Sequence, residues 1–145
     1  MLLHLHSGLR YLILLAGLAV IAYALRGVAL KQPHDKTMKR LAITFRSLMD
    51  VTLFSGIVMV TVGYNFSADA GMHVVLMMLA TVVSHVVPAV MRTRKQQERT
   101  LMPYAVATAV VVALVIVGTL SLGRPAFGWS STPTEQPGLQ PSPAP

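Results

Sequence analysis

Four long apolar stretches constrain the fold of this chain more than any other feature of its sequence. They cover about residues 3–25, 42–63, 71–91 and 102–122. The hydrocarbon core of a bilayer is about 30 Å thick and an α-helix rises about 1.5 Å per residue, so about 20 apolar residues cross it. Soluble proteins seldom contain several helices of this length and apolarity. The sequence therefore predicts an all-α fold in which residues 1–123 form an integral membrane bundle of four helices.

The composition points to the same class of protein. Of 145 residues, 54% are hydrophobic and 12% are charged, whereas about a quarter of the residues of a soluble domain are charged. This composition excludes an ordinary soluble enzyme and a disordered chain. The net charge of +7 does not indicate a nucleic-acid binder, because nine of the twelve Lys and Arg residues lie in two short segments between apolar stretches. The chain has no Cys, which excludes disulfides, thiolate metal sites and covalent c-type haem attachment.

The basic residues also predict the orientation of the bundle. Segments 26–41 and 92–100 hold nine Lys and Arg residues, whereas segment 64–70 has none and the tail has only Arg124. Basic loops remain in the cytoplasm. We therefore expect an up-down-up-down, multi-pass bundle in the cell inner (plasma) membrane, with the N- and C-termini on the periplasmic or external side. Residues 124–145 hold six of the nine prolines, which predicts a disordered external tail.

The string Ala22-Tyr23-Ala24 allows an alternative for the N-terminal stretch, because it resembles a signal-peptide cleavage site. Cleavage there would place the basic segment 26–41 outside the cell. The charge distribution therefore favours a retained first helix.

Ionisable residues inside a bilayer are costly, and each needs a partner or a purpose. His6 and His73 lie at the same expected depth near the outer face, on different helices. Two neutral imidazoles placed in this way can bind one haem b as axial ligands. Arg10, one helical turn from His6, could contact a haem propionate. The alternative is that both histidines are interface residues hydrated by headgroup water.

Copper is a further alternative at this end of the bundle. His4, His6, Met72, His73 and Met77 supply imidazole and thioether donors, which suit Cu(I). Methionine also fills gaps in apolar cores, so most of the nine methionines are expected to be packing residues.

A second group of ionisable residues lies deeper in the predicted bundle. Arg46 and Asp50 have the i, i+4 spacing of an ion pair on one helix, and His85 lies at a similar depth on the next helix. These residues are expected to form either a buried polar network that holds the two helices together or a proton or quinone site. The network is favoured, because an Arg–Asp pair neutralises itself.

Several short motifs occur along the chain, and they are the opening HSGLRY at residues 6–11, Gly-Met-His at 71–73, Ser-His at 84–85 and Gly-Arg-Pro at 123–125. Together they resemble one family of small four-helix bacterial membrane proteins, which are often labelled "cytochrome B" and expected to be bacterial inner-membrane proteins. The resemblance covers about residues 4–126. In that family the first histidine of the third helix usually stands in a Glu-His-Pro string, and here Met72 and Val74 replace the acid and the proline.

The resemblance implies haem b and electron transfer. It implies that His6 and His73 are haem ligands and adds His85 as a further candidate. We therefore expect a small b-type cytochrome-like membrane protein that carries haem near the outer face. It would exchange electrons with respiratory membrane subunits or quinone. The alternative is a cofactor-free accessory or structural subunit of a larger membrane complex. No hydrolase or transferase motif occurs, so an electron carrier or accessory subunit is favoured over a stand-alone catalyst.

The orientation can be tested with a reporter that is active only in the cytoplasm. Fused after residue 145, this reporter should give no signal, because the tail is expected outside the cell. The same reporter fused within segment 92–100 is the positive control. A strong signal from the C-terminal fusion would contradict the predicted orientation.

Overall fold

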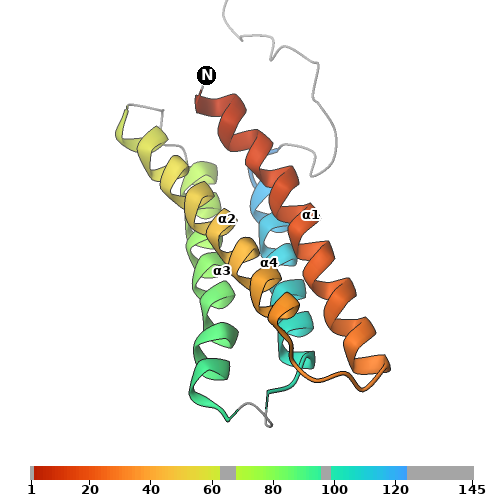
Figure 1. Cartoon of the computed structure of the whole chain (residues 1–145). Coiled ribbons are helices and arrows are strands. Elements are labelled where there is room, and N and C mark those ends of the chain that lie inside the picture. The colour runs from red at the N-terminus through yellow and green to blue at the C-terminus, as the bar shows by residue number, and fades with distance from the viewer. Residues whose placement is uncertain (1, 63–67, 96–98, 124–145) are drawn as a thin grey trace, which may run out of the picture.

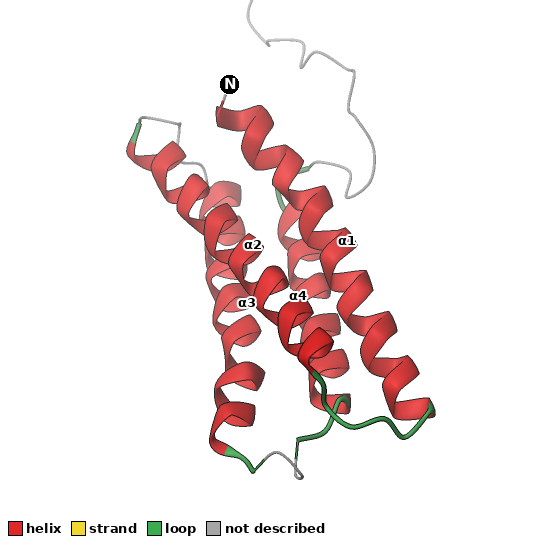
Figure 2. Ribbon diagram, viewed as in Figure 1, coloured by secondary structure: helices red, strands yellow, loops and turns green. Residues whose placement is uncertain are grey.

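Four helices make up most of the part of the chain that the structure describes. The structure is a computed structural model, and it describes residues 2–62, 68–95 and 99–123. The helices are α1 (Leu2–Ala29), α2 (Lys36–Thr61), α3 (Ala68–Thr93) and α4 (Met102–Leu120) (Figures 1 and 2). All four are long and apolar enough to cross a membrane, which confirms the predicted all-helical architecture. The predicted tail, residues 124–145, lies outside the described residues.

The helices extend beyond the apolar stretches at several ends, most clearly at the start of α2. This helix begins at Lys36, six residues before the apolar stretch that starts near residue 42. Asp35 is its N-cap, and its Oδ1 accepts a hydrogen bond from the Met38 amide at 2.9 Å. An N-cap carboxylate satisfies amides that have no partner within the helix. Hydropathy locates the apolar part of a helix, whereas the cap determines where the helix begins.

The helices pack as a ring in which each contacts its two neighbours, so α1 lies between α2 and α4 and diagonally opposite α3 (Figure 1). The largest fully buried side chains come from α1, α2 and α4, and they are Ile13, Val20, Met38, Met49 and Val111. Large apolar side chains also cover the outside of the bundle, as at Leu15 and Phe54. Helices that are apolar on all faces suit lipid contact.

Gly17 allows three helices to approach one another closely. A Cβ atom at this position would lie 2.7 Å from Val112 Cγ2 on α4 and 3.1 Å from Phe45 Cε2 on α2. Small residues of this kind let membrane helices pack at short range. Gly8, on the same helix, has no atom within 4 Å of the equivalent position.

The connection between α1 and α2 is anchored to the bundle by two hydrogen bonds. Nε2 of the buried His34 forms a hydrogen bond of 3.2 Å with the Tyr104 hydroxyl on α4. The Tyr23 hydroxyl on α1 donates a hydrogen bond of 2.6 Å to Asp35 Oδ2. Burial lowers the pKa of His34 below its ordinary value, and the nearby Arg99 charge lowers it further. The hydrogen bonds from Tyr23 and from the helix amide lower the pKa of Asp35. We call this end of the bundle the loop end.

We predict that Gly17→Leu destabilises the protein, because the larger side chain must displace Val112 and Phe45. Overpacking of this kind costs about 1–3 kcal/mol. The free energy of unfolding in mixed detergent micelles measures the effect. Gly8→Leu is the matched control and should leave the stability nearly unchanged. Equal stability of the two variants would show that α1 does not pack closely at Gly17.

We also predict that acidification weakens the loop end through His34. Because the folded state lowers the pKa of His34, its neutral form is the stabilising one, and this stability is lost as the pH falls through the lowered pKa. The melting temperature should therefore decrease as the pH drops below about 6.5, which is the ordinary pKa of histidine. In His34→Gln this part of the pH dependence should be absent, whereas His4→Gln, at an exposed position, should retain it. The lowered pKa of Asp35 places its own contribution at more acidic pH.

Candidate functional site

The structure brings His6 and His73 together inside one end of the bundle. The two rings come from α1 and α3, which face each other diagonally, and their centroids are 6.4 Å apart with an interplanar angle of 76°. Both side chains are partly buried. We call this end of the bundle the histidine-pair end. The two imidazoles therefore meet across the bundle near one of its ends.

Hydrogen bonding determines which nitrogen of His73 carries the proton. Its Nδ1 lies 2.5 Å from the Gly118 carbonyl oxygen on α4. A carbonyl oxygen can only accept, so Nδ1 is the donor. In the neutral ring Nε2 then carries the lone pair.

The same reasoning assigns the tautomer of His6. Its Nδ1 lies 2.9 Å from the Ser55 hydroxyl oxygen on α2, and that hydroxyl donates its proton to the Thr52 carbonyl at 2.8 Å. The Ser55 oxygen must therefore accept from Nδ1 of His6. Both histidines thus donate from Nδ1 to the protein and carry their lone pairs on Nε2. In metal-binding histidines one ring nitrogen binds the metal, and the N–H of the other ring nitrogen donates a hydrogen bond to the protein.

Two glycines line the histidine pair on the remaining two helices. A Cβ atom on Gly56 of α2 would lie 3.3 Å from Cε1 of His6. A Cβ atom on Gly118 of α4 would lie 2.6 Å from Met77 Cε and 3.5 Å from Nδ1 of His73. Backbone rather than side chain therefore lies beside both rings, and the space next to each glycine is already filled by neighbouring side chains.

Comparison with protein-family models, with curated proteins and with solved structures finds no match to this chain. The function must therefore be argued from the geometry and chemistry of the residues themselves.

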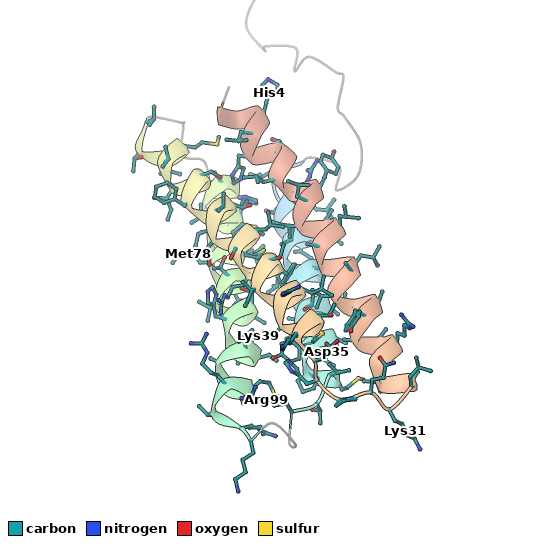
Figure 3. All side chains as sticks on the ribbon, viewed as in Figure 1. His4, Lys31, Asp35, Lys39, Met78 and Arg99 are labelled. Atoms are coloured by element: carbon teal, nitrogen blue, oxygen red, sulfur yellow. The ribbon has the colours of Figure 1, made fainter. Side chains whose placement is uncertain are left out.

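The other residues proposed for the histidine-pair end differ in their exposure and in their contacts. Arg10 is partly buried; its Nη2 donates to the Tyr11 hydroxyl at 2.8 Å and its guanidinium lies over that ring. His4 lies at the start of α1 and is exposed (Figure 3). Of the thioether candidates for copper, Met77 is buried and Met72 is exposed. Among the described residues, no group of three or more His, Asp and Glu side chains could hold a metal ion.

The second predicted cluster consists of Arg46, Asp50 and His85, and the structure brings Asp50 and His85 together. His85 Nε2 lies 3.5 Å from Asp50 Oδ2, and the side chains are 43% and 48% exposed. Within the described chain Arg46 forms no ion pair with Asp50, although the i, i+4 spacing allows one. Asp50 instead contacts the neighbouring helix α3. The cluster is therefore a half-exposed His–Asp pair between α2 and α3 rather than a buried network of three residues.

Sequence reasoning did not identify Ser55, Gly56 and Gly118 as parts of the site. Ser55 and Gly56 lie near the end of α2 and Gly118 near the end of α4, so counting helical rise from each end would have placed all three near His6 and His73. Depth alone does not determine which side of a helix faces inward. That information comes from the packed structure.

Proposed function

We propose that this chain is a small b-type cytochrome-like protein that holds haem b between His6 and His73 and serves as an electron carrier in a respiratory membrane. Its redox partner would be another membrane subunit or a quinone. The observation that carries the proposal is the histidine pair itself. It consists of two imidazoles on diagonal helices, each held at Nδ1 by the protein.

The proximity of the rings supports shared ligation of one metal. The ring centroids of His6 and His73 lie 6.4 Å apart, with the rings at 76° to each other. A metal–imidazole nitrogen bond is about 2 Å long, so both imidazoles would be within reach of a single iron.

The residues around the pair suit a haem group. Haem supplies one-electron redox chemistry, which the polypeptide alone lacks. His6 and His73 would hold the iron, and their hydrogen bonds to Ser55 and to the Gly118 carbonyl would orient them and raise their basicity. Arg10 would neutralise a propionate.

We infer an up-down-up-down bundle in the bacterial inner membrane, with both termini on the periplasmic side and the histidine-pair end near the outer face. Figure 3 supports this orientation, since Lys31, Lys39 and Arg99 lie at the end opposite His4. Basic residues concentrated at one end mark the cytoplasmic side.

The proposal predicts the absorption spectrum of the detergent-purified protein. With an adequate haem supply during expression, a sharp Soret band and reduced α and β bands should appear. His6→Ala and His73→Ala should each lose the bound haem, whereas His4→Ala should retain it, because His4 is exposed and does not belong to the pair. His73→Met offers a second test. If it retains haem, its reduction potential should rise, because a Met/His ligand pair has a higher potential.

A colourless, folded protein would contradict the cytochrome proposal. The cofactor-free accessory subunit would then be the better interpretation, and the proteins that co-purify with the chain would become the next measurement. Full haem loading of His73→Ala would remove His73 from the site.

A further inference from the structure

The His85–Asp50 pair is the ionisable feature that the proposed haem site does not explain. Asp50 lies near the middle of α2, and both side chains are close to half exposed on helices that are long and apolar enough to span a bilayer. Ionisable side chains in such a position are costly and usually mark a functional site. A purely structural pair would be expected inside the bundle, where the helices shield it.

The hydrogen bonds of His85 orient its ring toward Asp50. Nδ1 of His85 lies 3.0 Å from the Thr81 carbonyl oxygen, so Nδ1 donates. Nε2 lies 3.5 Å from Asp50 Oδ2. The pair therefore places a ring nitrogen of α3 beside a carboxyl oxygen of α2, at the surface between the two helices.

The surroundings of the pair are apolar and open. On α2, Val51 and Phe54 are 53% and 68% exposed, and on α3, Val82 and Val86 are 61% and 49% exposed. Met78 is seven residues before His85, two helical turns on the same side of α3, and Figure 3 shows it projecting outward from the bundle. A ligand can therefore reach the pair from the lipid.

We propose that the Asp50–His85 pair binds the headgroup of a lipid-soluble quinone. A quinone carbonyl can accept a hydrogen bond from Nε2–H of His85 when the ring is protonated, and a quinol hydroxyl can donate to the Asp50 carboxylate. Phe54 provides an aromatic face for the flat ring, and the exposed valines provide an apolar surface for the tail. A phospholipid headgroup would lie at the membrane surface rather than at this depth.

This inference deepens the proposed function and rests on it in one respect, since it names the electron-exchange partner of the proposed cytochrome. Binding of the quinone does not itself require haem. His85 follows His73 by twelve residues on α3, which separates the two sites by about 18 Å along the helix. Substitutions at one site can therefore be made without touching the other.

Photoaffinity labelling of the full chain in phosphatidylcholine nanodiscs tests the site. The probe is an azido-benzoquinone with a short isoprenoid tail, and labelled peptides are located by mass spectrometry. We expect labelling of α2 near Asp50 and of α3 near His85, with competition by the unlabelled quinone. Labelling confined to other segments would overturn the proposal.

Substitutions at the pair allow the change in quinone affinity to be measured. Asp50→Leu and His85→Leu should bind the quinone about tenfold more weakly, because each loses a charge-assisted hydrogen bond. Thr44→Leu, another exposed polar position on α2, is the matched control and should bind normally. Asp50→Asn keeps the shape and removes the carboxylate that accepts from a quinol, so it should also weaken binding. Unchanged affinity in the folded leucine variants would overturn the proposal.

The haem spectrum and the particle size of each sample separate the remaining outcomes. A red protein that does not bind the probe would overturn the quinone site and leave the cytochrome proposal intact. A colourless protein that binds the probe at the pair would overturn the cytochrome proposal and leave the quinone site intact. A dimer that becomes monomeric in Asp50→Leu and never binds the probe would overturn the quinone site in favour of a contact between two copies.

Discussion

Polar atoms in an apolar helix bundle must find partners within the protein, and this constraint organises both polar clusters of the molecule. His73 meets it by donating to the Gly118 carbonyl, although that carbonyl also accepts a hydrogen bond from the Ser121 hydroxyl. A carbonyl oxygen has two lone pairs and can serve both donors. The missing Cβ of Gly118 leaves room for the terminal methyl group of Met77, which would lie 2.6 Å from such an atom. Ser55 serves His6 in a similar way, because its own proton is directed to a helix carbonyl.

These partners determine how each imidazole is oriented, since both rings donate from Nδ1 to the protein. In its neutral form each ring would present an unprotonated Nε2, which is the atom that the proposed haem site needs. The hydrogen bonds of His6 and His73 are therefore compatible with the proposed ligand role.

Much of the fold could be predicted from the sequence, because the length of an apolar stretch is set by the thickness of a bilayer. The shared depth of His6 and His73 also follows from helical rise alone. The rotation of each helix does not, since helices that are apolar on all faces carry little information about which side faces inward. For this reason the Arg46–Asp50 contact was expected from spacing, whereas Asp50 contacts His85 on the neighbouring helix instead. The start of α2 was missed because Asp35 caps a polar first turn that hydropathy does not detect.

The two polar clusters differ in exposure, and this difference matches what each proposed ligand must do. An electron can enter and leave an enclosed cofactor without any atom passing through the protein, so His6 and His73 can lie within the bundle. A quinone that carries protons must reach its site from the lipid, so its partners must lie on an open face. His85 and Asp50 lie 3.5 Å apart and are each close to half exposed. A partly buried pair and a more exposed pair therefore fit the proposed coupling of a fixed redox group to a mobile one.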